Sequence, residues 1–212
     1  MRRKKYKNNV GMTLIEVMMA IAIFAIGIEG FTLLFAKTWK TNSYVIEMGQ
    51  SSLSASQGLN RMVDYIRRAR QGDDGSYPLK SGNGNDLVIY CDFNKDGVTE
   101  RLHFYKSNLE ILMGVTRPTD TLPKTYPVSD QETVTVASYI VNGDDTPVFS
   151  YFNRDYPADM SNNPLATPIL VSDARLVKVY LEINMKPESA PDNIKMQSFV
   201  EMRNLNDYDR IR

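Results

Sequence analysis

Hydrophobic side chains dominate residues 12–36 and then occupy only one side of the segment that follows. The run over 12–36 exceeds the ~20 apolar residues that cross the hydrocarbon core of a bilayer. Farther along, apolar positions step by three and four, as on one face of a helix: Ala55, Leu59, Met62, Val63, Ile66 and Ala69. We therefore predict one helix over residues 12–71, stopped by Gly72, with a transmembrane first part and an amphipathic continuation over 37–71.

From residue 87 onward the hydrophobic period changes to two, which is typical of strands. The clearest alternation places Val177, Val179 and Leu181 on one face of a strand. Asp96-Gly97 and Ser107-Asn108 have the composition of tight turns. The predicted strands cover residues 87–92, 98–105, 109–115, 132–141, 148–152, 176–185 and 196–203. The predicted fold class is α+β, with the distal half of the long helix packed on an antiparallel β-sheet from a domain of residues 72–212.

One carboxylate, Glu16, interrupts the apolar run near its start. An ionisable group in a spanning segment costs roughly 2.5–3.5 kcal/mol on insertion scales and is usually retained for function. A basic leader precedes the run: Arg2, Arg3, Lys4, Lys5 and Lys7. Three interpretations compete: a plain membrane anchor, a secretory signal, and a cut after Gly11 that leaves the apolar helix on the mature chain. No small-residue cleavage site follows the apolar run, which disfavours the secretory signal.

The tract from Gly11 to Glu16, GMTLIE, resembles the processing site of type IV prepilins and type II secretion pseudopilins. The resemblance implies that residues 1–11 are a leader and that a prepilin peptidase cuts after Gly11. It implies that Met12 becomes the N-methylated first residue, where most members of the family have Phe. Glu16 then faces the terminal amine of a neighbouring subunit, and residues 12–36 form the core of a helical filament.

Simple electrostatics supports a pairing role for Glu16. A terminal amine and a glutamate have reference pKa values of about 8 and about 4.3, so both are ionised at neutral pH. Buried together the two charges compensate one another, whereas either charge alone is costly. The structural alternative is that Glu16 snorkels to the inner interface, because it lies only about four residues, or ~6 Å, into the helix.

Charge predicts the orientation of the chain and disfavours one class of partner. The basic leader places the N-terminus in the cytoplasm and the C-terminal domain outside, in a single-pass inner-membrane protein. Loss of the five leader charges from 25 basic residues leaves 20 against 25 acidic ones, a net charge of −5. No general nucleic-acid binding is expected from a chain of that sign. The resemblance implies other partners: pilin or pseudopilin subunits, the prepilin peptidase, an inner-membrane assembly platform and, before assembly, membrane lipid.

Catalytic signatures are missing from the sequence. It has one His, His103, one Cys, Cys91, and no G-x-S-x-G, P-loop or C-x-x-C motif. We therefore expect no enzymatic activity and no cofactor. Cys91 lies in a predicted strand and is expected to pack as a small apolar residue.

The motif D-x-N-x-D-G, which begins at Asp92, is the start of a Ca²⁺-binding loop. An EF-hand also requires a bidentate Glu at the twelfth position, which is His103 here, and flanking helices instead of predicted strands. Two interpretations stay open. One is a calcium site of another type that uses Asp92, Asn94, Asp96 and Glu100. The other is a hairpin turn in which the Asp and Asn side chains cap backbone groups.

The C-terminal domain has a looser resemblance to the J-type minor pseudopilins of type II secretion and the W-type minor pilins of type IV pili. It rests on Arg67-Arg68-Ala69-Arg70 at the helix end, on the loop from Asp92 to Gly97, and on Phe149-Ser150-Tyr151 before a variable loop and two final strands. The resemblance implies a structural subunit near the tip of a type II secretion pseudopilus or type IV pilus.

A binding role is the alternative function. Residues 116–131 and 153–173 are long, Pro-containing predicted loops, and loops of this length are often functional. On this hypothesis the chain is a pilin-like module that recognises a secreted substrate, DNA or a surface. The aromatic residues expected to be exposed for this purpose are Tyr126, Tyr151, Phe152 and Tyr156.

Overall fold

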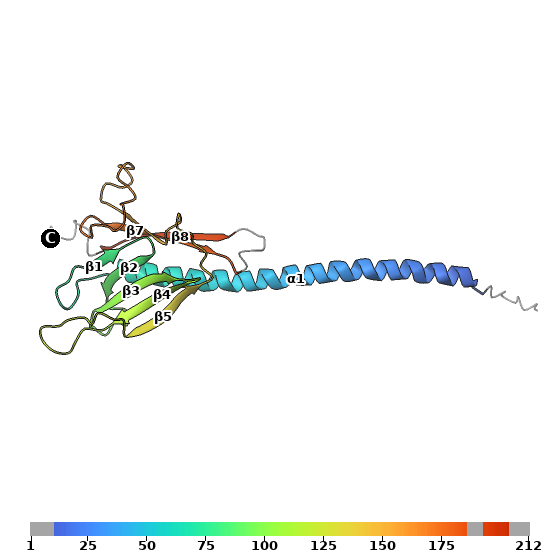
Figure 1. Cartoon of the computed structure of the whole chain (residues 1–212), viewed down its shortest axis with the longest axis horizontal. Coiled ribbons are helices and arrows are strands. Elements are labelled where there is room, and N and C mark those ends of the chain that lie inside the picture. Colours follow the sequence, from blue (N-terminus) through green and yellow to red (C-terminus); the bar gives the residue numbers. More distant parts are fainter. Residues whose placement is uncertain (1–10, 186–192, 204–212) are drawn as a thin grey trace, which may run out of the picture. The chain divides into compact units, whose positions relative to one another are not determined.

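The computed structural model describes residues 11–185 and 193–203; most of the predicted leader, residues 1–10, lies outside this range. Within these described residues, one long helix precedes eight strands (Figure 1). Their bounds are α1 (Leu14–Arg67), β1 (Leu79–Gly82), β2 (Asp86–Cys91), β3 (Glu100–Ser107), β4 (Glu110–Thr116), β5 (Glu132–Ser138), β6 (Phe149–Phe152), β7 (Leu176–Ile183) and β8 (Ile194–Glu201). The fold is α+β, a long N-terminal apolar helix packed against antiparallel β-sheets, as the sequence predicts.

The chain divides into two compact units, Met1–Ile46 and Glu47–Arg212. In the described part of the first unit, α1 is the sole element and none of its side chains is buried. Burial in α1 begins at Met48 and follows helical spacing: Met48, Ser51, Ala55, Gly58, Leu59, Met62, Val63 and Ile66. These positions contain the predicted amphipathic stripe except Ala69, which is also buried but lies beyond the end of α1 at Arg67. It is therefore this part of the helix that contributes to a core.

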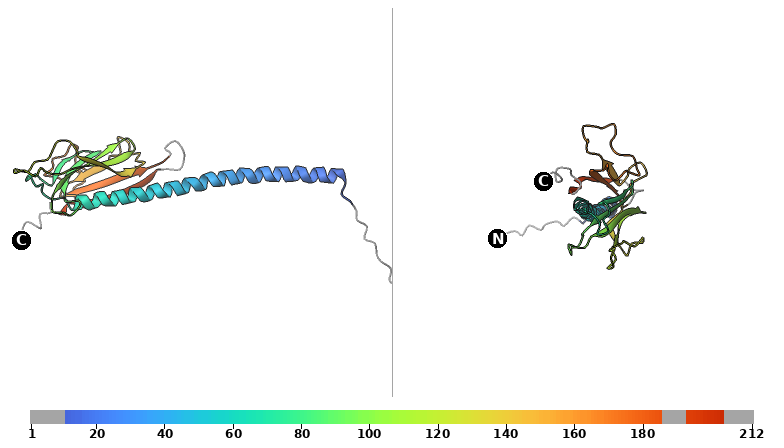
Figure 2. Two further views of the ribbon diagram at one scale, coloured as in Figure 1. Left: turned by 90° about the horizontal axis from the view of Figure 1, so that it is seen from below. Right: turned by 90° about the vertical axis from the view of Figure 1, so that its left-hand side faces the viewer.

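The second unit contains two antiparallel sheets where the sequence analysis predicts one (Figure 2). The first is a meander in the order β1-β2-β3-β4-β5, and the second has the order β6-β7-β8. Tyr139, with a φ of 63°, ends the first sheet because a bulky residue in the left-handed region cannot continue a strand. The next residue, Ile140, forms an isolated bridge to Ile183 of β7 and so links the two sheets.

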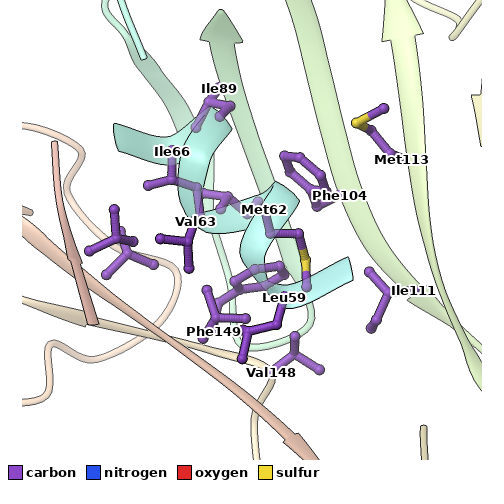
Figure 3. Packing of buried hydrophobic residues seen from close by; sticks show 14 of the residues in the cluster. Leu59, Met62, Val63, Ile66, Ile89, Phe104, Ile111, Met113, Val148 and Phe149 are labelled. Carbon is purple, nitrogen blue, oxygen red and sulfur yellow. The ribbon is translucent and has the colours of Figure 1, made fainter. Parts of the chain in front are cut away.

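Side chains from α1 and both sheets form one core. Met62 and Ile66 of α1 are completely buried, as are Phe104 of β3 and Phe149 of β6. Figure 3 shows this group, with the α1 side chains between those of the first sheet and those around Phe149. Removing a side chain of this size from water is worth about 1.5–3 kcal/mol, so the distal half of α1 is held mainly by burial of apolar surface.

Two local predictions have clear outcomes. The tight turn at Ser107-Asn108 is confirmed, since Ser107 pairs with Glu110 and Asn108 has a φ of 53°. Strand β1, by contrast, was not predicted. It has only four residues, and its one large apolar side chain, Leu79, provides no alternation to recognise.

Candidate functional site

The predicted processing tract lies where the extended N-terminal chain becomes helix α1. Gly11 and Met12 precede the helix and are exposed. A side-chain carbon built on Gly11 would meet no atom within 4 Å apart from its chain neighbours. The geometry is therefore compatible with access by a peptidase.

Glu16 and Thr13 form a capping box at the start of α1. The Glu16 carboxylate oxygen Oε2 accepts hydrogen bonds from the Thr13 backbone N–H, at 2.8 Å, and from its hydroxyl, at 2.9 Å. In return the Glu16 N–H donates to the Thr13 hydroxyl at 3.4 Å. This reciprocal arrangement satisfies backbone donors that a helix start otherwise leaves open. This capping role is not among the predictions from the sequence, although the T-x-x-E spacing of Thr13 and Glu16 is its signal.

The helix that carries Glu16 presents apolar surface on every side. Within the described residues, α1 is the one helix long and apolar enough to cross a membrane, judged by length and composition. Large side chains remain exposed along it, among them Phe24 at 69% and Ile26 at 72%. A helix that is hydrophobic all round belongs in lipid or inside an assembly. The first unit therefore requires an environment that a single copy in water does not provide.

The side chains of the predicted calcium loop cap backbone groups between β2 and β3. The two carboxylate oxygens of Asp92 accept hydrogen bonds from the N–H groups of Asp96 and Gly97, both at 3.1 Å. Asn94 Oδ1 also accepts from the Asp96 N–H, at 3.2 Å, and Asp96 Oδ1 accepts from the Val98 N–H at 2.8 Å. Gly97 adopts a φ of 93°, which favours glycine. The loop is a hydrogen-bonded hairpin turn, and its affinity for calcium stays a prediction.

Glu100 closes this loop and is a buried carboxylate. It lies opposite Cys91 in the β2–β3 pairing, is 0% exposed, and neither of its oxygens makes a hydrogen bond. Burial raises the pKa of the Glu100 carboxyl, and the negative charges of Asp96 and Asp92 raise it further, against the lowering effect of the Phe93 amide. A buried carboxylate with so little compensation is costly.

His103 lies between two carboxylates on the first sheet. Its Nε2 is 2.6 Å from Asp86 Oδ2 and its Nδ1 is 3.0 Å from Asp130 Oδ2. Asp130 belongs to the loop after β4 and also lies 3.3 Å from Arg101 Nη2. The pKa of the Asp130 carboxyl is lowered. Burial acts to raise this pKa, but the hydrogen bond and charge of His103, together with the hydrogen bond from Arg101, outweigh the effect of burial. The cluster fastens the loop to the sheet.

The sequence does not predict the cluster of His103, Asp86 and Asp130, because its three members come from separate parts of the chain. His103 pairs with Gly114 in the sheet register, and a side-chain carbon on Gly114 would overlap the Asp130 carboxylate. Glycine at this position is what allows Asp130 to reach His103. No pattern in a single sequence indicates such a close approach.

Other predicted residues have definite positions. Cys91 is buried and packs in the core, as predicted, and burial raises its thiol pKa to about 11. The expectation of exposed loop aromatics is wrong for Tyr151 and Phe152, which are 0% and 6% exposed because β6 faces the core. Tyr126 is half-buried and donates a hydrogen bond to the Thr99 carbonyl at 2.6 Å.

Comparison with known proteins identifies the N-terminal segment. Residues 7–28 match the family described as "Prokaryotic N-terminal methylation motif". No curated protein and no solved structure matches the chain. The matched segment contains Gly11, Met12 and Glu16 and includes the start of the exposed apolar helix. Proteins with this motif are structural subunits, made as prepilins that are anchored in the inner membrane. The chain is accordingly a type IV pilin- or pseudopilin-like protein, whose family implies processing by a prepilin peptidase and assembly with other pilins.

Proposed function

We propose that this chain is a minor pilin or pseudopilin, a structural subunit near the tip of a type II secretion pseudopilus or type IV pilus. It is cut after Gly11, methylated on Met12 and inserted into the filament through Glu16. The observation that carries the proposal is the methylation motif at the head of a helix whose apolar side chains are exposed from Met12 to Ile46. Lipid covers this surface before assembly, and neighbouring subunits cover it afterwards.

The same proposal fixes the orientation. The N-terminus lies in the cytoplasm and residues 72–212 lie outside it, because the basic leader is retained on the inner side. Accessibility labelling in intact cells tests this arrangement. In cells without the prepilin peptidase, where the leader stays on the chain, a reagent that cannot cross the inner membrane should modify cysteines introduced at exposed positions 120 and 145 but not one introduced at position 5. Labelling at position 5 and not at positions 120 and 145 would show that the orientation is opposite to the one proposed.

Processing is tested by mass analysis of the N-terminus. Chain produced in cells with an active prepilin peptidase should begin at Met12 and carry one additional methyl group. In cells without the peptidase it should retain residues 1–11. A mature chain that still carries the leader in the presence of the peptidase overturns the proposal.

Glu16 has two candidate roles, helix cap and intersubunit partner, and paired variants separate them. Glu16→Gln keeps a side chain that can complete a capping box but removes the charge that pairs with a terminal amine. Thr13→Ala removes the cap and keeps the charge. We expect both variants to be processed, Glu16→Gln to be nearly absent from sheared filaments, and Thr13→Ala to be incorporated. Normal incorporation of Glu16→Gln would end the pairing role.

The position near the tip has its own test. Purified filaments should contain far fewer copies of this chain than of the main subunit, and immunogold label should lie at one end of each filament. Label distributed along the filament, or equal copy numbers, contradicts a tip subunit.

A second function, recognition of a partner by loops of the β-domain, is favoured by one observation. Four aliphatic side chains of the two long loops are largely exposed: Leu122 at 86%, Val128 at 98%, Met160 at 63% and Leu170 at 72%. Exposed aliphatic residues favour a protein surface over nucleic acid as the partner. If recognition is the function, the double change Leu122→Ser and Val128→Ser should abolish transport or adhesion and leave filament assembly intact.

A further inference from the structure

Two Asn-Gly pairs occur in the sequence, and the structure places them in opposite surroundings. Asn83-Gly84 lies between β1 and β2, and Asn142-Gly143 follows the bridge that links the two sheets. An asparagine before glycine is prone to ring closure, because no side-chain carbon shields the glycine nitrogen from the asparagine carboxamide. Both pairs have this chemistry, and the fold determines which of them can use it.

Asn142 is held through both atoms of its side-chain amide. Its Nδ2 donates to the Thr146 carbonyl at 2.9 Å and to the Tyr180 carbonyl at 3.0 Å. Its Oδ1 accepts a hydrogen bond from the Glu182 N–H at 2.8 Å, and the residue is 3% exposed. Ring closure would break all three hydrogen bonds at a buried position, where unpaired polar groups are costly. The fold therefore protects Asn142.

Asn83 has none of this protection. The residue is exposed, and no described residue makes a hydrogen bond with its carboxamide. The Gly84 N–H likewise donates to no acceptor among the described residues. The carboxamide carbon of Asn83 and the nitrogen of Gly84 therefore have no hydrogen bond to break before they meet.

A buried tyrosine also polarises the Asn83–Gly84 peptide. The Tyr151 hydroxyl donates a hydrogen bond to the Asn83 carbonyl oxygen at 3.0 Å and shares it with the Asp86 carbonyl at 3.3 Å. Burial raises the pKa of this hydroxyl well above its ordinary value, so the donor keeps its proton in mildly alkaline buffer. A hydrogen bond to an amide oxygen withdraws electrons from the amide and makes its N–H more acidic. Tyr151 therefore assists loss of the proton from the Gly84 nitrogen.

We propose that Asn83 is a site of spontaneous deamidation and that Asn142 is not. The deprotonated Gly84 nitrogen attacks Cγ of Asn83, a C–N bond forms, and the Cγ–Nδ2 bond breaks. Ammonia leaves with the proton lost by the Gly84 nitrogen, and residues 83 and 84 then share a succinimide ring. Water that opens the ring at Cγ gives aspartate at position 83, and water that opens it at the main-chain carbonyl gives isoaspartate. The reaction consumes water, releases ammonia and needs no other reactant.

Either product alters the connection between β1 and β2. The Asn83 N–H donates to the Asp86 carbonyl at 2.7 Å, so a new carboxylate at position 83 lies across the turn from that of Asp86. Like charges directly opposite one another destabilise an antiparallel pair. Isoaspartate also lengthens the main chain between residues 82 and 84, which displaces the carbonyl that Tyr151 binds. We therefore expect the reacted chain to have a lower Tm than the parent.

The test follows both pairs in the same molecule. The full chain in detergent is incubated in mildly alkaline, heavy-oxygen water and then digested with trypsin in ordinary water, so that reaction during digestion is distinguished. Cleavage after Lys80, Lys95, Lys124 and Arg154 places the two asparagines on separate peptides. Tandem mass spectrometry should find heavy oxygen at position 83 at least about tenfold faster than at position 142, because the latter must first lose three hydrogen bonds. Equal rates in the folded chain would overturn the proposal.

Incubation in urea separates the effect of the fold from that of the local sequence. In the unfolded chain both pairs are exposed, so Asn83 and Asn142 should convert at similar rates. If Asn142 is as slow in urea as in the folded chain, the fold does not protect it and the proposal is wrong. If Asn83 reacts only in urea, it is not a site in the native protein.

Variants test the roles of Gly84 and Tyr151. Gly84→Ala should slow conversion at position 83, because the methyl group shields the nitrogen, whereas Gly143→Ala should leave it unchanged. Tyr151→Phe should also slow it. A fold loosened by that change would have the opposite effect, so a faster or unchanged rate at position 83 overturns the role of Tyr151. Near-UV circular dichroism checks that each variant is folded, and conversion of folded Gly84→Ala at the parent rate contradicts attack by the Gly84 nitrogen.

Discussion

The two halves of helix α1 show how one continuous helix serves two environments. From Leu14 to Ile46 it has no buried residue, and its apolar side chains are distributed around the whole circumference. From Met48 to Ile66 the buried positions recur every three or four residues and face a core. The first half is therefore stabilised by what surrounds the chain, and the second by the chain itself. A substitution should act on folding in one half and on assembly in the other.

Glycines of α1 also differ in whether other parts of the chain pack against them. A side-chain carbon on Gly27, Gly30 or Gly49 would meet nothing within 4 Å. On Gly58 it would overlap the carbonyl oxygen of Val136, in β5. Gly58 is thus required for close approach of helix and strand, while the other glycines are free of packing constraints within the single chain.

The largest expected effect comes from comparing a buried phenylalanine of β3 that packs on the second half of α1 with an exposed phenylalanine in the first half. Phe104→Ala should lower the free energy of unfolding of the β-domain by about 3–5 kcal/mol, because the ring is fully buried and stacks on Tyr65. Phe31→Ala, at 71% exposure, should change it by no more than about 0.5 kcal/mol. Urea unfolding in detergent, followed by near-UV circular dichroism, measures both. Equal losses in the two variants would break the distinction between the halves.

Gly58→Ala is expected to have the next largest effect. The added carbon forces α1 away from β5, which typically costs about 1–3 kcal/mol. The control, Gly30→Ala, should be neutral or stabilising by about 0.4–1 kcal/mol, because it only reduces the freedom of the unfolded chain. The same unfolding measurement applies. If Gly58→Ala proves as stable as the parent, the helix is not in close contact with Val136.

The first half of α1 and the β-domain differ in how much of their structure the sequence predicts. The apolar composition of residues 14–46 is enough to indicate an apolar environment, such as lipid. The T-x-x-E spacing at Thr13 also indicates the cap at the start of the helix. In the β-domain, period-two patterns predict seven of the eight strands, yet not the division into two sheets at Tyr139. Nor do they predict the meeting of His103 with Asp86 and Asp130. Local periodicity determines strands, whereas sheet membership and side-chain clusters depend on contacts between distant residues.

Low pH should destabilise the folded second unit in part by protonating Asp130. Its lowered folded-state pKa means that it contributes stability that is complete above the unfolded-state value of about 3.9. That contribution is lost as the pH falls through the lower folded-state pKa. Asp130→Asn should be less stable than the parent near pH 7, because Arg101 and His103 lose a charged partner, and should lack this part of the acid sensitivity. Asp120→Asn, in the same loop but exposed, should retain the profile of the parent. Parallel Tm-against-pH curves for the parent and Asp130→Asn would contradict the role of Asp130.

The smallest effect is expected at the head of the first half, from Thr13→Ala. Loss of an N-cap costs about 0.5–2 kcal/mol, but here it should fray only the first turn of α1. The β-domain should unfold at the same urea concentration, and hydrogen exchange should quicken only for the amides at the start of the helix. The Glu16 carboxylate loses the Thr13 hydroxyl as a donor but keeps the backbone N–H of residue 13, and it retains its charge for pairing with a terminal amine. If the variant instead fails to enter filaments while Glu16→Gln succeeds, the cap and not the charge is what assembly requires.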